Sequence, residues 1–531
     1  MTDPQVPAAA PTAPVAEPAH DAEKLTARAK LGYVVLGART VLHQFLVFGG
    51  NLMLSRLLTP AEFGTFGLVQ FAFAFFMIYG DAGLAASLVQ KKEHPTQGEL
   101  STIFWAQSAL FVCVVGVVWS FADAMGLFWK DMPGGAPDIL RVLSLGLLTA
   151  SLRTVPSILL ERSLRFVRLS IVDLTVETAY YATAVTLAWR GHGARSLLAA
   201  VLVQGVLGMV LTQVMRPWWP SFTFDVAALR RSLGFGVAYQ TKGVISFVND
   251  ALTPLYGGRV LGAYTYGLIN WAQSTAYFPL KLIDVVSRVN FPLFSRLRSD
   301  PARFAKILET SIEACALATL FYVGLVFGVG RQLVSAIFSD QWLPAMPALH
   351  VYTVAIVLGF FSPLAAGALD ALGKPQIIMR LSFAWTALNW IVVSIVMRFS
   401  PTLIGFAVAY CVHVVVGNIA TLWAVRQELP NLRIAPRFGA GLVAALATAG
   451  LGRLLLSPWL EGSVARGLAE ATARFGLAGW QVTVGKAAVV VPSAVLPSAL
   501  VFLLVVLAVD RSAVDALRAL TGRRPRGEGA A

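Results

Sequence analysis

Long apolar segments follow one another along most of the chain and are separated by short polar stretches. A helix needs about 20 apolar residues to cross the hydrocarbon core of a bilayer, and about 14 segments reach that length. The pattern therefore predicts an all-α membrane protein that crosses the bilayer about 14 times. The predicted spans are 31–57, 62–90, 101–127, 138–161, 168–189, 195–215, 232–257, 262–292, 308–330, 343–369, 376–397, 402–425, 437–456 and 484–509.

Polar residues recur at helical spacing on the two spans between Arg231 and Arg298, which join at Gly257–Gly262. Steps of three, four and seven place such residues on one side of a helix. A charge that faces lipid tails is costly, so these sides are expected to face a protein interior or a hydrated cavity. The sets are Lys242, Ser246, Asn249, Asp250 and Thr253, then Asn270, Gln273, Ser274, Tyr277, Lys281, Asp284 and Arg288, with Thr40, Gln44, Asn51 and Ser55 on the first span.

The composition agrees with a membrane protein and adds an orientation. Hydrophobic residues make up 57% of the chain and charged residues 13%, whereas soluble domains carry roughly 25% charged residues. The net charge is +14, and most cations lie in the loops that place both termini in the cytoplasm by the positive-inside rule. No nucleic-acid partner is expected, because the cations lie between apolar spans and not on one soluble face.

A short internal repeat divides the chain. Thr65-Phe66-Gly67-Leu68 recurs as Thr265-Tyr266-Gly267-Leu268, and Arg168-Leu169-Ser170 recurs as Arg380-Leu381-Ser382. Such matches, in order, predict two pseudo-symmetric lobes of six helices that rock about a central cavity. The expected organisation is a disordered tail 1–30, an N-lobe 31–216, a linker 217–231, a C-lobe 232–428, two further spans over 429–510 with an outer loop 457–483, and a basic tail 511–531.

Local signals predict several helix ends. Thr59-Pro60-Ala61-Glu62 is a capping box with proline at the first helical position, so the second span is expected to begin there. Pro156, Pro254, Pro279 and Pro363 lie within spans and predict kinks.

Deep cations from both lobes suggest an anion-binding chamber. Arg39, Lys242, Lys281 and Arg288 are expected in the inner half of the membrane. In the functional interpretation they line a chamber open to the cytoplasm and hold a diphosphate, for which the planar fork of arginine is well suited. Further polar residues expected to line this cavity are Gln44, Asn51, Ser246, Asn249, Asn270 and Gln273.

The alternative interpretation of the same charges is a set of ion pairs between helices, such as Arg153 with Asp173 or Glu177. We favour ion pairs for the shallow residues, whose side chains can snorkel to the interface. For Arg39 and Lys242 we favour the chamber, because depth makes an unused charge costly. The shallow residues are Arg153, Asp173, Glu177, Arg288 and Glu313.

Carboxylates supply candidates for coupling or gating. Asp81, Asp250 and Asp284 lie within the predicted spans. Two roles stay open for Asp250, which would carry a coupling proton or pair with Lys242. Lys281 with Asp284 is a further candidate pair at the inner gate.

The sequence carries no signature of an enzyme. A P-loop, a glycine-rich nucleotide fingerprint and an HExxH motif are all absent, and the three cysteines have no metal-binding spacing. We therefore expect no catalytic residue, metal or cofactor. Energy for net transport must then come from an ion gradient, the membrane potential or consumption of the product.

The first two spans resemble a known family. The residues that carry the resemblance are Leu54-Ser55-Arg56-Leu57-Leu58-Thr59-Pro60-Ala61-Glu62-Phe63-Gly64, Gly80-Asp81-Ala82-Gly83-Leu84 and Leu88-Val89-Gln90-Lys91-Lys92. They are similar to the bacterial polysaccharide-biosynthesis flippases for lipid-linked oligosaccharides, within the multidrug/oligosaccharidyl-lipid/polysaccharide (MOP) exporter superfamily. Of these residues, Arg56 is expected at the outer membrane face in a structural role.

The resemblance implies a fold and a function. The fold is a V-shaped pair of six-helix bundles that works by alternating access in the inner membrane. The function is transfer of undecaprenyl-diphosphate-linked oligosaccharide to the periplasmic leaflet for exopolysaccharide, capsule or O-antigen biosynthesis. The implied partners are this polyprenyl-diphosphate lipid, the bilayer and the polysaccharide polymerase and export machinery.

Two alternatives to a flippase stay open. An ion-coupled drug or cation antiporter of the same superfamily predicts a cavity dominated by carboxylates, whereas the deep charges here are mainly cationic. A membrane glycan polymerase or ligase needs a sizeable outer loop with catalytic residues, and the loops here are short.

Overall fold

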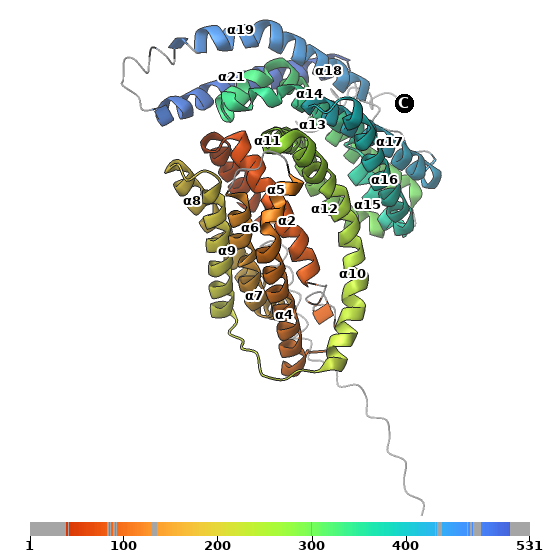
Figure 1. Cartoon of the computed structure of the whole chain (residues 1–531). Helices are drawn as coiled ribbons and strands as arrows, with labels where there is room; N and C mark the ends of the chain where they lie inside the picture. The colour runs from red at the N-terminus through yellow and green to blue at the C-terminus, as the bar shows by residue number, and fades with distance from the viewer. Residues whose placement is uncertain are drawn as a thin grey trace, which may run out of the picture.

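The computed structural model describes residues 39–509, apart from 41, 82–83, 85–86, 89–90, 92, 130–134, 299, 431, 433–437, 465, 468–469 and 471–478. Regular structure within these residues is helical, as the apolar pattern predicts. The tails 1–30 and 511–531 lie outside the described residues. Figure 1 shows one group of helices up to α9, a second from α10 to α17, and the C-terminal helices across the top of the view.

Ten helical segments among the described residues are long and apolar enough to cross a membrane. Each overlaps one predicted span, so these ten spans are confirmed, while the count of 14 stays a prediction. The segments are Pro60–Met77, Gln97–Ala124, Ala136–Arg162, Ala194–Met215, Pro301–Ile337, Asp340–Ala371, Pro375–Phe399, Leu403–Glu428, Phe438–Gly462 and Gly485–Val509.

The other four predicted spans are also helical, but they are more polar or more broken. The first is described as helical over 39–40 and 42–57. The other three correspond to α8 (Phe166–Trp189), α10 (Val226–Leu252) with its π-helical end η2 (Thr253–Gly257), and the consecutive helices α11 (Gly258–Ala276) and α12 (Phe278–Arg296). The first helix and α10 to α12 carry the predicted polar stripes, and α8 carries Asp173 and Glu177.

The kink predicted at Pro279 is confirmed, and it takes the form of a break in the span 262–292. The helix is interrupted at Tyr277, and Pro279 lies in the first turn of α12, where its missing N–H costs nothing. The predicted junction at Gly257–Gly262 is confirmed, because Gly262 has φ 80° and ψ 167°, a conformation that glycine adopts readily. Pro363 likewise follows a break, at the start of α15.

Two segments that the sequence assigns to connections between spans are partly helical. Asp225 caps α10 by accepting hydrogen bonds from the backbone N–H groups of Ala227 and Ala228, so the linker 217–231 is helical from Val226 onward. At the far end, helical turns continue past Ser457 to Val464, and the last helix begins at Gly479. The outer loop expected over 457–483 is therefore shorter than the apolar pattern suggests.

The N-lobe packs around the second span. The capping box at its start is confirmed, since the Thr59 backbone N–H donates to Glu62 and the Glu62 N–H donates to the Thr59 hydroxyl. Leu68, Leu143 and Ala184, from three helices, are fully buried in the lobe's core. Besides residues 42–57 and α8, its elements are α2 (Pro60–Asp81), α4 (Gln97–Phe121), η1 (Ala122–Ala124), α5 (Met125–Phe128), α6 (Ala136–Ser144), α7 (Gly146–Arg162) and α9 (Ala194–Met215).

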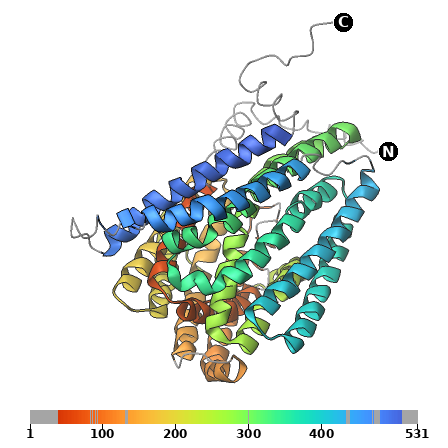
Figure 2. The same cartoon turned by 90° about the horizontal axis from the view of Figure 1, so that it is seen from above.

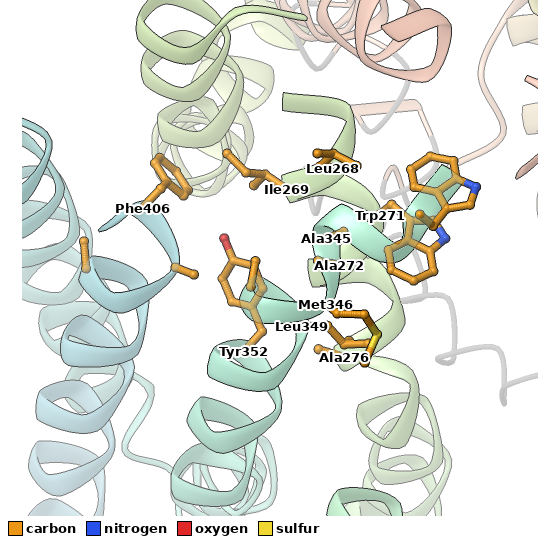
Figure 3. Close-up of a cluster of buried hydrophobic side chains, with 14 of the residues drawn as sticks. Leu268, Ile269, Trp271, Ala272, Ala276, Ala345, Met346, Leu349, Tyr352 and Phe406 are labelled. Carbon is orange, nitrogen blue, oxygen red and sulfur yellow. The ribbon is translucent and has the colours of Figure 1, made fainter. Parts of the chain in front are cut away.

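One cluster of the C-lobe's core lies near the break between α11 and α12. Trp271 stacks on Trp342 with ring centroids 5.1 Å apart, and Tyr352 and Phe406 are fully buried in the same cluster (Figure 3). Besides α10 to α12, the lobe contains α13 (Pro301–Ile337), η3 (Asp340–Ala345), α14 (Met346–Gly359), α15 (Ser362–Ala371), α16 (Pro375–Phe399) and α17 (Leu403–Glu428).

The C-terminal helices pack against α13. Side chains at Gly324 and Gly328 would press on the carbonyl oxygens of Ala445 and Thr448, so small residues allow the close approach. Figure 2 shows these helices running side by side along one flank of the C-lobe. They are α18 (Phe438–Leu451), η4 (Gly452–Leu456), α19 (Ser457–Trp459), η5 (Leu460–Val464) and α21 (Gly479–Val509).

The two lobes meet beside the repeated tetrapeptides, where α2 crosses α11. A side chain at Gly64 would clash with the carbonyl oxygen of Ala263, and one at Gly267 would clash with that of Pro60. The two backbones therefore touch through reciprocal glycines. Because the crossing lies at the beginning of both helices, the lobes are closed at the end of the bundle that the sequence predicts to be outside, which we call the outer end.

Gly267→Ala should destabilise the protein, because the added methyl group meets backbone and not a flexible side chain. Overpacking of this kind costs about 1–3 kcal/mol, which thermal unfolding in detergent will detect. Gly116→Ala on α4 is the matched control, since its Cβ would meet no described atom within 4 Å and alanine favours a helix. Equal melting temperatures for the two variants would contradict the tight crossing.

Candidate functional site

Two arginines from different helices share one carboxylate in the N-lobe. The guanidinium of Arg39 lies 2.8 Å from Oδ2 of Asp173, and that of Arg153 lies 2.8 Å from Oδ1. Arg39 belongs to the first described helix, Arg153 to α7 and Asp173 to α8, so the triad ties three helices together. The arginine side chains are 31% and 33% exposed, against 18% for Asp173. The cations therefore remain accessible while the carboxylate between them is largely covered.

The surrounding helices position this triad. Glu177 lies one turn beyond Asp173 on α8 and accepts a hydrogen bond of 3.1 Å from Gln204 Nε2 of α9. Gly208, one turn further along α9, leaves room for Arg153, because a Cβ there would lie 3.1 Å from the guanidinium. Both arginines therefore pair with Asp173, while Glu177 accepts its hydrogen bond from the neutral side-chain amide of Gln204.

The triad bears on the choice between an anion-binding chamber and ion pairs between helices, and the outcome differs for Arg153 and Arg39. The predicted ion pair of Arg153 with Asp173 is confirmed. Arg39, for which we favoured the chamber, is also paired with Asp173, a contact that the sequence did not predict. Its assignment as a ligand of the substrate stays a prediction, since a guanidinium that is one-third exposed can accept a second anionic partner.

The remaining charged candidates are distributed over three helices. Lys281 lies on α12 and is exposed. For the other charged candidates the structure describes the helix but not the side chain. Lys242 belongs to α10, Asp284 and Arg288 belong to α12, and Asp81 belongs to α2. Their convergence in one chamber stays a prediction.

The polar candidates of the first helix lie toward α8 or on the surface. Asn51 Nδ2 donates a hydrogen bond of 3.2 Å to the hydroxyl of Tyr181 on α8, which also packs against Gly50. Gln44 is exposed on the same helix. This helix is therefore fastened to α8 at two levels, through Asn51 and through Arg39.

The polar candidates of the C-lobe form two separate groups. On α10, Asn249 Oδ1 accepts a hydrogen bond of 3.3 Å from Asn389 of α16, and its amide lies 3.5 Å from Asp250. Ser246 is exposed one turn earlier. These contacts fasten α10 to its own lobe, so Asn249 is at least partly a structural residue.

On α11, two polar residues point in different directions. Asn270 faces the other lobe, where a Cβ at Gly67 would lie 3.6 Å from its amide nitrogen. Gln273 instead donates 3.3 Å to the Tyr277 hydroxyl, which in turn donates to Tyr410 of α17. The stripe predicted on this helix thus divides between the boundary of the lobes and the interior of the C-lobe.

The outer end holds a hydrogen-bonded seal between the lobes. Arg56 donates to the carbonyl oxygens of Ala336 and Ile337, the last residues of α13. Trp342 Nε1 donates 2.6 Å to the carbonyl oxygen of Ser55, and Gln341 Nε2 donates 2.8 Å to the same atom. An arginine at a helix C-terminus satisfies free carbonyls and complements the helix dipole. Arg56 therefore has the structural role that we expected for it.

Away from the seal, α10 makes two lighter contacts with the N-lobe, one near the middle of the spans and one at their inner ends. Phe71 of α2 stacks on Phe247 of α10 with ring centroids 5.0 Å apart. Glu99 on α4 is 2.7 Å from Lys91 and only 4.0 Å from Arg231 of α10. Since Arg231 is largely exposed, this ion pair contributes little by itself.

Sequence reasoning missed the residues of the seal that come from the C-lobe. Gln341 and Trp342 lie in a short turn between α13 and α14, and nothing in the linear pattern indicates their contact with Ser55. The one available signal was a tryptophan beside a polar residue at a span end, where indole N–H groups usually find a partner.

Comparison with known proteins gives a family and several relatives. A family described as "Polysaccharide biosynthesis protein" matches residues 53–347. The chain is 24% identical over 63% of its length to "Teichuronic acid biosynthesis protein TuaB" of Bacillus subtilis, and 23% identical over 58% to "Lipopolysaccharide biosynthesis protein WzxC" of Escherichia coli. It is 24% identical over 59% to "Succinoglycan biosynthesis transport protein ExoT" of Rhizobium meliloti. The matches span 68% of TuaB and 62% of each of the other two.

Solved structures share the architecture. "Lipid II flippase MurJ, inward closed conformation" matches with a TM-score of 0.65 and 14% identity, over 93% of this chain and all of that one. An inward-facing "multidrug resistance MATE family transporter of the MOP superfamily" matches with a TM-score of 0.55 and 14% identity, over 76% of this chain and 98% of that one. Because the family match covers more than half of the sequence, this chain belongs to the polysaccharide biosynthesis protein family, and it has the fold of the MOP-superfamily transporters.

Proposed function

We propose that this transporter is a flippase that moves undecaprenyl-diphosphate-linked oligosaccharide across the bacterial inner membrane for exopolysaccharide, capsule or O-antigen biosynthesis. The observation that carries the proposal is the family match over residues 53–347, because the relatives that share it are named for teichuronic acid, lipopolysaccharide and succinoglycan biosynthesis. The structural match to a lipid II flippase supports a fold suited to lipid-linked saccharides.

The accessible arginines of the triad are the proposed contact for the diphosphate. Arg39 and Arg153 present two guanidinium forks on either side of Asp173. A diphosphate carries more charge than one carboxylate and offers several acceptor oxygens, so it can compete with Asp173 for both forks. Asp173 would hold the arginines in place between transport cycles. Lys242, Lys281 and Arg288 remain proposed cationic partners from the C-lobe.

Alternating access requires the outer seal to open and the inner contacts to close more firmly. The seal depends on a few directed hydrogen bonds from Arg56, Gln341 and Trp342 and on the glycine crossing of α2 and α11. Such contacts form or break as a unit when rigid lobes rotate. We propose that the described state is the one open toward the cytoplasm or close to it.

The alternatives have less support. A drug or cation antiporter shares the fold, but the relatives quoted above are polysaccharide proteins. A polymerase or ligase would need catalytic residues at the outer end, and the helices there continue into what we expected to be a loop. Asp81, Asp250 and Asp284 stay candidates for ion coupling, and the polymerase and export machinery stays the proposed partner.

Arg39→Ala and Lys242→Ala should each impair export of surface polysaccharide in a deletion strain while the protein still inserts into the membrane. We expect at least a tenfold loss for Arg39→Ala, since charge-assisted hydrogen bonds contribute about 1.5–3 kcal/mol. Surface glycan and accumulated lipid-linked oligosaccharide are measured together. Arg190→Ala, an exposed arginine at the end of α8, is the control and should leave export unchanged. Full export by both test variants would reject the cationic site.

Asp173→Asn should destabilise the protein, because two partly covered arginines then lose their shared counter-charge. Fully buried pairs cost 3–5 kcal/mol to break, and exposed ones almost nothing, so we expect about 1–2 kcal/mol here. Thermal unfolding in detergent measures the effect. Asp138→Asn is the control, since Asp138 also binds an arginine but is 74% exposed. A larger loss at Asp138 than at Asp173 would contradict the assigned role.

Both termini are proposed to lie in the cytoplasm, which sets the side of every loop. In a variant without native cysteines, a cysteine at Arg190 should react with a membrane-impermeant maleimide in intact spheroplasts. A cysteine at Lys374 should react only after the membrane is permeabilised. Labelling in the opposite order would invert the topology and move the triad to the outer half of the membrane.

A further inference from the structure

A cavity of about 450 Å³ lies between the outer end of the C-lobe and the C-terminal helices, and none of the triad residues lines it. Its walls come from the last turns of α13, the first turn of α14 and the segment η4 to η5. Ligand-binding cavities in proteins typically measure about 300–1,000 Å³, so the space is sufficient for a headgroup. Its polar lining is Arg331, Gln332, His350, Arg453, Ser457 and Glu461.

Two guanidiniums in this cavity have no ion pair within the part of the chain that the structure describes. Arg331 and Arg453 are both exposed. Three other cations near the outer end each have a partner: Arg141 binds two carboxylates, Lys486 donates to a serine hydroxyl and Arg259 lies over a phenylalanine ring. Arg331 and Arg453 thus differ from these cations in having a shared cavity and not a side-chain partner.

The other polar groups of the cavity are already engaged. Gln332 Nε2 donates 2.7 Å to Glu461 Oε1 and also donates to Ser457 Oγ. The His350 ring packs against Phe327 with centroids 4.6 Å apart. The Glu461 carboxylate therefore already has a donor in Gln332. The cavity lining holds two guanidiniums, Arg331 and Arg453, and one carboxylate, so its net charge is positive.

The position of these arginines suits the phosphate level of a membrane. Arg331 lies about 9 Å below the end of α13, at 1.5 Å per residue, and Arg453 lies just beyond the end of α18. The positive-inside rule does not favour arginines at this end of the bundle, so topology alone does not account for them. Arginine is the side chain best suited to hold a phosphate through paired N–H donors.

We propose that this cavity binds the phosphate headgroup of a lipid in the outer leaflet, with Arg331 and Arg453 as its ligands. Two lipids carry this chemistry: an anionic phospholipid of the bilayer and a polyprenyl diphosphate. The site requires only an accessible phosphate at the outer end, so it stands independently of the proposed transport function.

Lipid binding to the purified full-length protein in neutral detergent tests the site. Native mass spectrometry with dioleoyl phosphatidylglycerol and, separately, undecaprenyl diphosphate should give at least a tenfold weaker Kd for the double variant Arg331→Gln/Arg453→Gln than for the natural sequence. The matched control, Arg190→Gln/Arg398→Gln, removes two exposed arginines from the ends of α8 and α16 and should stay within twofold. Melting temperatures of all variants are measured in parallel.

Ser457→Trp fills the cavity without removing a charge and should cause the same loss, which excludes a general effect of net charge. Loss of both lipids in these variants supports a site for any phosphate headgroup. Loss of undecaprenyl diphosphate alone supports a site for the polyprenyl lipid, and loss of phosphatidylglycerol alone supports a bilayer phospholipid. Unchanged binding of both lipids, or an equal loss in the control, would overturn the proposal.

Discussion

The structure depends on how charge is accommodated inside an apolar bundle. A charged side chain without a partner is costly within a membrane, and the N-lobe meets this constraint with two arginines on one aspartate. The arrangement more than neutralises the charge of Asp173, because each oxygen receives one guanidinium. It satisfies each arginine only in part, since a guanidinium has five donors. A triad of this composition is stable at rest and still able to take up a further anion, which a simple one-to-one ion pair would do less well.

The two lobes differ in chemistry where the structure describes them, despite their repeat. In the C-lobe, Gln273, Tyr277 and Tyr410 form a chain of neutral hydrogen-bonding groups, whereas the N-lobe holds the triad. At the glycine crossing each lobe contributes one glycine and one backbone carbonyl. The backbone contact between the lobes is therefore reciprocal.

Much of the fold could be predicted from the sequence, because apolar length, capping and proline are local properties. The ten apolar spans, the capping box before α2 and the glycine junction before α11 all follow from residues that are near in sequence. The break at Tyr277 follows likewise from Pro279, two residues further on. The partner of Arg39 was missed because it depends on the rotation of two separate helices, which periodicity does not determine. Gln341 and Trp342 were missed likewise, since their acceptor lies in the other lobe.

The outer seal needs arginine contacts that stay fixed, whereas an anion site at the triad needs contacts that can be exchanged. The two sets of contacts therefore lie in different parts of the bundle. Arg56 is bound to the carbonyls that end α13, so its charge is used by a helix terminus and is unavailable to a diphosphate. The hydrogen bonds of the seal must be specific, whereas a transport site must exchange its partners. In the proposed mechanism the fully engaged arginine lies at the lobe boundary and the partly engaged arginines lie within one lobe, so an anion would bind without first breaking the seal. Opening would then follow from rotation of the N-lobe, since Arg56 and Arg39 both lie on the first described helix. An anion that draws Arg39 away from Asp173 would therefore act directly on the element that holds the seal closed.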